Sequence, residues 1–155
     1  MNTIKGDLLR LAKEGRFDVI VHGCNCQRTM GAGIAKQIAR ELPEVAFTDR
    51  VTSKNKGGEV DIVDLKDYDF KVINAYTQIH WGRSKPMSGF DSQEDRYRYI
   101  KKCMTAINVK FKSKRIGLPL IGCGLAGGDW KIVEKIVENT LVDCDVTIVE
   151  YKKGN

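Results

Sequence analysis

Short runs of β-branched apolar residues alternate with longer segments of helical periodicity along this chain, and this alternation constrains the fold more than any other feature. Residues 18–24 form one such run and are typical of a strand buried on both faces. Helices are predicted at 31–42, ended by Pro43, and at 92–111, where apolar residues recur every three or four positions. Because helices between strands imply parallel pairing, this order predicts a largely parallel sheet.

Two further strands are predicted at 60–65 and 71–75, and only five residues connect them. A connection this short favours an antiparallel hairpin, so the sheet should be mixed. Later runs predict strands at 116–120 and 146–151, with a helix between them that begins near residue 129. We therefore expect an α/β fold, specifically a three-layer α/β/α sandwich with a mixed, mostly parallel central sheet.

Length and composition favour one domain over several. A chain of 155 residues, with 42% hydrophobic and 30% charged residues, suits one compact globular domain. We expect a single domain over residues 1–155, present as a monomer. No apolar run approaches the roughly 18 residues of a membrane span, and the first residues do not resemble a signal peptide. These features predict a cytoplasmic protein without a membrane partner, and the odd count of five cysteines predicts reduced thiols.

The chain is basic, with a formal charge of +6 at pH 7, which favours an anionic partner such as a nucleotide or nucleic acid. The densest basic cluster consists of Lys110, Lys112, Lys114 and Arg115 and follows a predicted helix. Cations at that place also stabilise the negative end of the helix dipole. A solvated helix end and a nucleic-acid patch both remain open, although the sequence has no zinc-finger or RNA-recognition pattern.

Two glycine-bearing loops, at 22–35 and 122–130, each follow a predicted strand. In open α/β sheets, ligands bind beyond the carboxyl ends of the strands, where glycine lets the backbone come close and helix amides attract anions. Two such loops could hold a diphosphate between them, although glycine also simply ends strands and forms tight turns. Neither loop matches GxxxxGK[ST], or GxGxxG with a later acidic residue. Nucleoside-triphosphate hydrolysis and dinucleotide hydride transfer are therefore disfavoured.

Four segments of the chain, in this order, resemble a known family. They are KGDLL at 5–9, VHGCNC at 21–26, MGAGIA at 30–35 and GCGLAGGDW at 122–130. Together they look like a macro domain, and the resemblance implies an ADP-ribose-binding protein with a three-layer fold and a mixed sheet. HxCNC followed by GxGIA is further similar to the ADP-ribose 1''-phosphate phosphatases of the yeast type. That type is related to terminal ADP-ribosyl-glutamate hydrolases and to DNA ADP-ribosyl glycohydrolases.

The resemblance implies binding roles for individual residues. Asp7 would accept a hydrogen bond from the adenine amino group, with the backbone of Leu8 beside the base, although Asp7 is also placed to cap a helix. Asn25 would contact the hydroxyls of the distal ribose, and an Asx turn is the alternative. Segments 31–35 and 122–127 would cradle the diphosphate. The full set implied to bind substrate is Asp7, Leu8, Gly23, Cys24, Asn25, Met30, Gly31, Ala32, Gly33, Ile34, Ala35, Thr77, Gly122, Cys123, Gly124, Leu125, Ala126 and Gly127.

The chain departs from the relatives that use a lysine for hydrolysis. Those relatives carry the lysine in a TKxHW-like segment, where this chain has Gln78, and an acidic residue in the second loop, where it has Ala126. A side-chain amide is neither a nucleophile nor a base, so lysine-dependent chemistry is disfavoured. Trp81 ends the same segment and either borders the ligand or covers the edge of the core.

The resemblance to the phosphatase type instead implies a catalytic role for His22, together with Asn25 and Asp129. An imidazole that titrates near neutral pH suits proton transfer during hydrolysis of a phosphomonoester. The alternatives are that His22 is a satisfied strand-end histidine and that Asp129 is the N-cap of the helix that follows it.

Cys24 and Cys26 alternate with His22 and would share one face of the strand, which raises the possibility of a metal site. Residues that bind structural zinc are normally separated by at least two others, so we expect no metal, and we expect no cofactor. A cysteine nucleophile at 24 or 26 is a further alternative, although buried, inert thiols are the commoner outcome.

The function predicted from these residues is binding of ADP-ribose and hydrolysis of ADP-ribose 1''-phosphate to ADP-ribose and phosphate. Two alternatives remain open. One is an ADP-ribose-binding module without turnover. The other is a hydrolase that acts on ADP-ribosylated protein or nucleic acid, or on O-acetyl-ADP-ribose, so the expected partners are ADP-ribose derivatives and ADP-ribosylated macromolecules.

Overall fold

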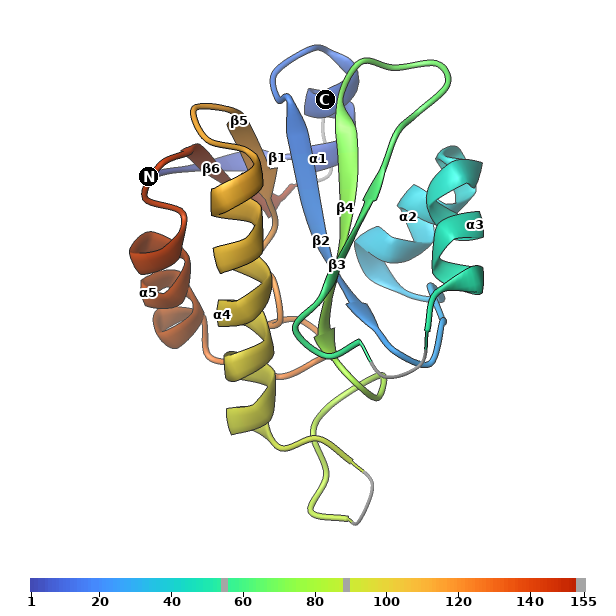
Figure 1. Cartoon of the computed structure of the whole chain (residues 1–155), viewed down its shortest axis with the longest axis vertical. Helices are drawn as coiled ribbons and strands as arrows, with labels where there is room; N and C mark the ends of the chain where they lie inside the picture. Colours follow the sequence, from blue (N-terminus) through green and yellow to red (C-terminus); the bar gives the residue numbers. More distant parts are fainter. Residues whose placement is uncertain (54–55, 88–89, 153–155) are drawn as a thin grey trace.

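The central sheet has six strands in the order β1-β6-β5-β2-β4-β3 (Figure 1). This computed structural model describes residues 1–53, 56–87 and 90–152. Every neighbouring pair of strands is parallel except β3 and β4, which are antiparallel, so the predicted mixed sheet is confirmed. Along the chain, the elements are β1 (Asn2–Gly6), α1 (Leu8–Lys13), β2 (Val19–Asn25), α2 (Gly33–Glu41), α3 (Pro43–Val51), β3 (Val60–Val63), β4 (Lys71–Gln78), α4 (Gln93–Lys110), β5 (Arg115–Leu118), α5 (Trp130–Thr140) and β6 (Asp145–Tyr151).

Helices cover both faces of the sheet, with α4 and α5 on one face and α1, α2 and α3 on the other (Figure 1). Successive residues of β2 alternate between the two layers, as a strand requires. Val19 and Val21 pack in the core beneath α4 and α5, whereas Ile20 packs in the core beneath α1 to α3. The predicted three-layer α/β/α sandwich is therefore confirmed. Within the described residues, none of the helices is long and apolar enough to cross a bilayer.

Several elements differ from the sequence prediction. β3 ends at Val63 instead of residue 65, and β5 ends at Leu118 instead of residue 120. β1 is absent from the prediction because four of its five residues are exposed and carry no apolar pattern; it is held at the edge of the sheet by pairing with β6. Pro43, expected only to end a helix, is the first residue of α3, where its missing N–H has no intrahelical partner to lose. β4 continues past the predicted end at Ala75 as far as Gln78.

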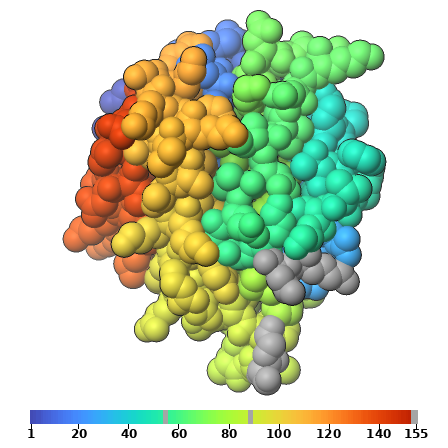
Figure 2. Space-filling model, in the orientation of Figure 1, coloured from blue at the N-terminus to red at the C-terminus, as the bar shows by residue number. Residues whose placement is uncertain are grey.

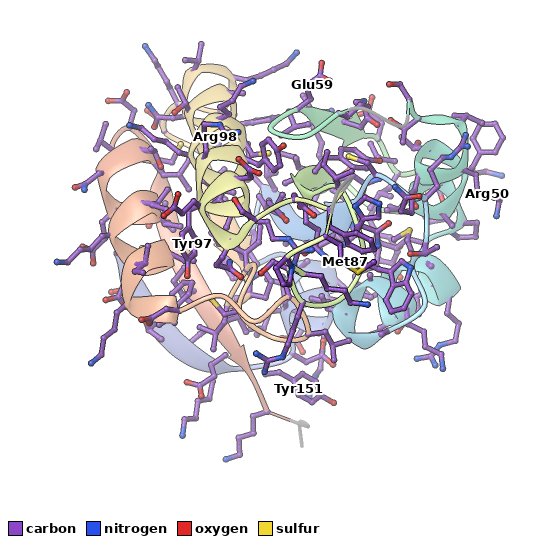
Figure 3. The ribbon with its side chains drawn as sticks, turned by 90° about the horizontal axis from the view of Figure 1, so that it is seen from below. Arg50, Glu59, Met87, Tyr97, Arg98 and Tyr151 are labelled. Carbon is purple, nitrogen blue, oxygen red and sulfur yellow. The ribbon has the colours of Figure 1, made fainter. Side chains whose placement is uncertain are left out.

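The parallel strands all end at one edge of the sheet, which we call the carboxyl edge. The first glycine loop follows β2 and the second follows β5, so both lie at this edge. The segment 79–87 follows β4 and protrudes at the lower end of the molecule (Figure 2). Figure 3 views the molecule from below, toward this end of β2 and β4.

Candidate functional site

A pocket of about 740 Å³ opens at the carboxyl edge and is lined by both glycine loops. Its volume is in the range of sites for small organic ligands. Most of the residues predicted to bind substrate line it, namely Gly23, Cys24, Asn25, Met30, Gly31, Ala32, Gly33, Ile34, Ala35, Thr77, Gly122, Cys123, Gly124, Leu125 and Ala126. The fold therefore brings two loops that are far apart in the sequence to one pocket.

Glycines serve two different purposes in these loops. Gly31 and Gly124 have no atom within 4 Å of the place where a Cβ would lie, so the space beside them is open to a ligand. At Gly128, an added Cβ would lie 2.5 Å from the carbonyl oxygen of Gly122, which already accepts a hydrogen bond from the Gly128 N–H. Gly122 itself has a φ of +75°, which residues other than glycine rarely adopt.

The start of α2, where backbone N–H groups lack intrahelical partners, lies at the pocket. Gly33, Ile34 and Ala35 form its first turn and line the pocket wall. In the part of the chain that the structure describes, no side chain caps this helix, because Ala32 at the N-cap has no side-chain oxygen. The first N–H groups of a helix lack intrahelical partners and attract anions. This wall therefore suits an anionic ligand group such as a diphosphate.

A second hollow of about 450 Å³ adjoins the pocket. Leu8 lines this hollow, whereas Asp7 lines neither space. The Asp7 carboxylate caps α1 by accepting a hydrogen bond of 3.1 Å from the Arg10 N–H, and it accepts a second of 3.3 Å from Gln37. The geometry thus matches the helix-cap alternative for Asp7. The walls shared by the hollow and the pocket are Gly33, Ile34, Pro119, Val149 and Tyr151.

His22 lies behind the pocket, and the structure does not bring it to the lining. Its imidazole is completely buried, and Nε2 donates a hydrogen bond of 2.6 Å to Oδ1 of Asn74. Burial lowers the pKa of His22 to about 4, so the ring is neutral near pH 7. This geometry matches the alternative of a satisfied histidine, although His22 lies in the middle of β2 and not at a strand end.

Asn25 lines the pocket while its side chain organises the first loop. Oδ1 accepts a hydrogen bond of 3.0 Å from the Gln27 N–H, which is an Asx turn. Nδ2 donates to the hydroxyl of Thr29 at 2.9 Å. The Asx turn named as the alternative is therefore present, and the contact of Asn25 with ribose hydroxyls stays a prediction.

Asp129 is the N-cap of α5 and is exposed. Its side chain accepts a hydrogen bond of 2.9 Å from the Lys131 N–H, and its own N–H donates to the Tyr97 hydroxyl at 3.0 Å. Asp129 does not line the pocket, and neither does Gly127, which lies against the side chain of Arg83. The structure thus places Asp129 as a cap at the outer end of the second loop.

Thr77 has an unusual place in the pocket wall. Its side chain is 2% exposed, and among the described residues its hydroxyl has no hydrogen-bond partner. An added Cβ at Gly23 would lie 2.9 Å from this hydroxyl, so β2 passes close beside it. A buried hydroxyl without a partner costs free energy, and a ligand hydroxyl or amide could satisfy it.

The described lining of the pocket contains no Asp, Glu, His, Lys or Arg. Gln78 lines the pocket, but its amide donates a hydrogen bond of 2.7 Å to the backbone oxygen of His80. Burial raises the pKa of Cys24 well above its usual value and also raises the pKa of Cys26. Burial together with Asp129 raises the pKa of Cys123 to about 11. These thiols are protonated near pH 7, which disfavours the alternative of a cysteine nucleophile at 24 or 26.

The described residues contain no group of three or more His, Cys, Asp and Glu side chains placed to hold a metal ion. His22 and Cys24 do approach each other, with Sγ 3.6 Å from Nε2. A third ligand is not beside them among the described residues, and Asn74 occupies the imidazole N–H instead.

Part of the lining lies outside the predicted binding set, and most of these residues lie at or just beyond the ends of strands. Trp81 is 62% exposed and lines the pocket, which settles that it borders this space instead of covering the core. Tyr151, at the end of β6, is 69% exposed and also lines it (Figure 3). The rule that strand ends meet at one edge could have identified Tyr151. The other lining residues outside the predicted binding set are Thr29, Gln78, Gly82, Pro119, Leu120, Ile121 and Val149.

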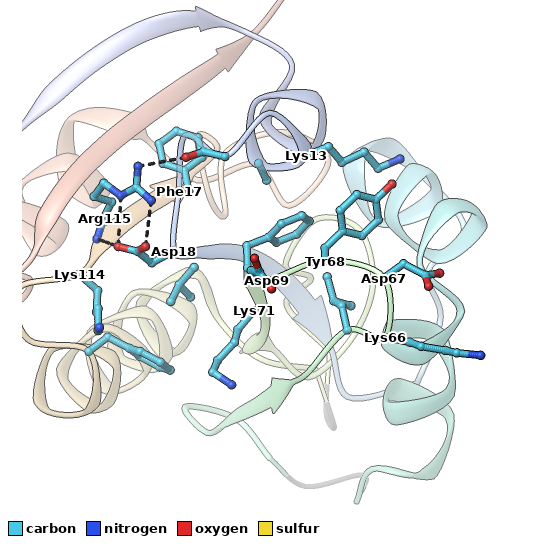
Figure 4. A pocket seen from close by; sticks show the side chains of 16 residues that line it. Lys13, Phe17, Asp18, Lys66, Asp67, Tyr68, Asp69, Lys71, Lys114 and Arg115 are labelled. Carbon is cyan, nitrogen blue, oxygen red and sulfur yellow. Dashed lines mark hydrogen bonds and ion pairs between the residues drawn. The ribbon is translucent and has the colours of Figure 1, made fainter.

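A further hollow of about 830 Å³ lies at the other end of the sheet strands, and Lys114 and Arg115 of the basic cluster line it (Figure 4). Arg115 makes an ion pair with Asp18, with Nη2 2.9 Å from Oδ1. Lys71 in the same wall is paired with Asp64. The cluster therefore lies away from the glycine loops, and part of it is already paired.

Comparisons with known proteins identify the family of this chain. The family model of the macro domain matches residues 21–137. A DNA ADP-ribosyl glycohydrolase of Mycobacterium tuberculosis is 31% identical over 160 residues, which span 97% of this chain but only 42% of that protein. An ADP-ribose 1''-phosphate phosphatase of Candida glabrata is 26% identical over 174 residues, spanning 95% of this chain and 96% of that protein. The solved macrodomain of Mycobacterium tuberculosis DarG is 26% identical, has a TM-score of 0.71 and covers 96% of this chain and 95% of that chain. The chain therefore belongs to the macro domain family, as the resemblance of its four segments predicts.

Proposed function

We propose that this chain binds ADP-ribose in the pocket at the carboxyl edge and hydrolyses ADP-ribose 1''-phosphate to ADP-ribose and phosphate. The observation that carries the proposal is that both glycine loops and the uncapped start of α2 line one pocket. The names of the mycobacterial and yeast relatives support a hydrolase of ADP-ribose derivatives in general.

In this proposal, the diphosphate lies between the backbone of Gly31 to Ala35 and that of Gly122 to Ala126. The adenine end extends into the adjoining hollow beside Leu8 and Tyr151. The distal ribose reaches the hydroxyl of Thr77, whose buried oxygen then gains the partner that it lacks within the described protein.

Hydrolysis of the monoester needs one water molecule. Its oxygen forms a bond to phosphorus, the bond between phosphorus and the oxygen on C1'' breaks, and one proton of the water passes to that sugar oxygen. Backbone N–H groups of the second loop would stabilise the charge on the transferring phosphoryl group. The catalytic roles predicted for His22, Asn25 and Asp129 stay predictions, and the proposal routes no proton through His22, because its ring is completely buried and does not line the pocket.

A second candidate function is recognition of ADP-ribose without turnover. It is favoured by one observation, the lack of any Asp, Glu, His, Lys or Arg in the described lining. A pocket of this kind supplies amides and hydroxyls that bind, but it supplies no side chain that exchanges a proton near neutral pH.

One experiment separates these functions and the macromolecular alternative. The protein is incubated with ADP-ribose 1''-phosphate, O-acetyl-ADP-ribose, ADP-ribosylated protein and ADP-ribosylated DNA, and its affinity for ADP-ribose is measured by calorimetry. Release of phosphate from the monoester alone supports the phosphatase, and binding without release supports the recognition module. Release of ADP-ribose from a modified macromolecule replaces both with the hydrolase alternative.

A matched pair of variants links the result to the pocket. Gly31→Val places a side chain in open pocket space and should weaken ADP-ribose binding at least tenfold. Ala106→Val makes the same kind of addition on the exposed face of α4, away from the pocket, and should leave the affinity within twofold. Equal affinity for both variants would mean that ADP-ribose does not bind here.

A further inference from the structure

Arg96 of α4 is 1% exposed, and hydrogen bonds account for all five of its N–H groups. Nε donates to Oδ2 of Asp91 at 3.0 Å, and Nη2 donates to Oδ1 of the same carboxylate at 3.2 Å. Nη2 also donates to the backbone oxygen of His80 at 3.1 Å. Nη1 donates to the backbone oxygens of Gly82 at 2.5 Å and Ala126 at 3.2 Å. A single guanidinium group therefore holds four separate points of the chain.

These points belong to two walls of the pocket. Ala126 lines the pocket from the second glycine loop, and Gly82 lines it from the segment after β4. Trp81 lies between His80 and Gly82, and the carbonyl groups on both sides of it are bonded to Arg96. The indole is 62% exposed and also lines the pocket. Arg96 thus fixes the backbone that presents Trp81 and ties it to the opposite loop.

Asp91 completes this arrangement from the far side of the guanidinium. Its Oδ2 also accepts a hydrogen bond of 2.7 Å from the Ile79 N–H, where β4 has just ended. Burial raises the pKa of Asp91, but the hydrogen bonds from Arg96 and from the Ile79 N–H outweigh burial and lower the pKa overall. The carboxylate is therefore charged near pH 7, and the buried ion pair stays formed.

Arg96 is a charged residue at a buried position of α4, where an apolar residue would be expected. It lies on the buried face of α4, four residues before Ile100, and the other buried residues of this helix are Ile100, Cys103, Met104 and Ile107. Only a planar fork with five donors reaches two carboxylate oxygens and three carbonyl oxygens at once. Lysine has one nitrogen and three donors, so it keeps the charge but cannot hold all of these groups.

We propose that Arg96 is a positioning residue that holds Trp81 against the second glycine loop and so determines how tightly the mouth of the pocket closes on its ligand. This inference rests on the proposed function, because it takes ADP-ribose as that ligand. According to this inference, Arg96 lies outside the pocket but determines the geometry of two of the pocket walls.

The test compares Arg96→Lys with Arg98→Lys, both in a Trp130→Phe background in which Trp81 is the only tryptophan. Arg98 is an exposed arginine on the same helix, paired with Asp95, and serves as the matched control. Two quantities are measured: the affinity for ADP-ribose by calorimetry, and the nanosecond motion of the Trp81 indole by time-resolved fluorescence anisotropy without ligand. Circular dichroism establishes that each variant is folded.

We expect Arg96→Lys to weaken ADP-ribose binding at least tenfold and to increase the amplitude of fast Trp81 motion, with Arg98→Lys within twofold of the parent in both measurements. A folded Arg96→Lys protein with the affinity and anisotropy of the parent would overturn the inference. If the parent itself fails to bind ADP-ribose, the proposed function fails, while the anisotropy without ligand still tests whether Arg96 holds Trp81.

A second variant covers the case in which Arg96→Lys does not fold. Asp91→Asn keeps an oxygen for the Ile79 N–H but removes the charge that orients the guanidinium. It should also weaken ADP-ribose binding, by at least threefold. It should likewise increase the amplitude of fast Trp81 motion. Unchanged affinity and unchanged anisotropy in a folded Asp91→Asn protein would equally overturn the proposal.

Discussion

Nε2 of His22 lies 2.6 Å from Oδ1 of Asn74, and both side chains are completely buried in the sheet. The pairing orients the imidazole away from solvent, and burial lowers the pKa of His22 from 6.5 to about 4. The unfolded chain therefore binds more protons than the folded chain between these two values.

Acid should thus destabilise the protein through His22. The free energy of unfolding should fall as the pH drops from 6.5 to 4, by at most roughly 3 kcal/mol from this residue. His22→Gln keeps a hydrogen-bonding side chain without a titrating ring, so its stability should change less over that interval. Urea unfolding at pH 7, 5.5 and 4.5 checks this, and parallel pH dependences for both proteins would show that His22 titrates normally.

Removal of the buried hydroxyl of Thr77 should affect the stability of the protein and its affinity for ADP-ribose in different ways. Thr77→Val has nearly the same shape but lacks an oxygen that has no partner among the described residues. The free energy of unfolding should stay constant or rise by up to about 1 kcal/mol. Affinity for ADP-ribose should fall about tenfold, because the ligand loses a buried hydrogen bond. Thermal unfolding and calorimetry measure the two effects, and a stability loss with full affinity would contradict the assignment.

Glycines of the second loop should differ in their tolerance of alanine. Gly128→Ala forces a Cβ to within 2.5 Å of the Gly122 carbonyl oxygen and should lower the free energy of unfolding by roughly 2 kcal/mol. Gly124→Ala adds its methyl group where no atom lies within 4 Å, so the stability should change by less than about 0.5 kcal/mol. Equal losses in chemical denaturation would mean that the loop adjusts freely around Gly128.

Much of the fold is predictable because its main strands and helices are buried on a regular period. β2 shows this well, since Val19, Ile20 and Val21 are all buried and alternate between two helix layers. β1 could not be predicted in this way. It is stabilised by main-chain pairing with β6, and this pairing requires no pattern of apolar side chains.

The site was predictable to the extent that it is made of backbone. Glycines after two strands indicate loops at one edge, and both loops do line one pocket. Side-chain roles were harder to predict, because the surroundings of His22 and Asp129 depend on Asn74 and on the start of α5. Arg96 had one usable signal, a charge at a buried position of a helical stripe, but its partners come from segments that only the tertiary structure brings together.

The central claim is that two loops from different strands grip one diphosphate. The most direct test is the change in backbone amide NMR shifts when ADP-ribose is added to the ¹⁵N-labelled protein. We predict the largest shifts at Gly31, Gly33, Gly124 and Ala126, in both loops at the same ligand concentration. Shifts confined to one loop, or shifts around the hollow beside Lys114 with neither loop affected, would contradict the claim.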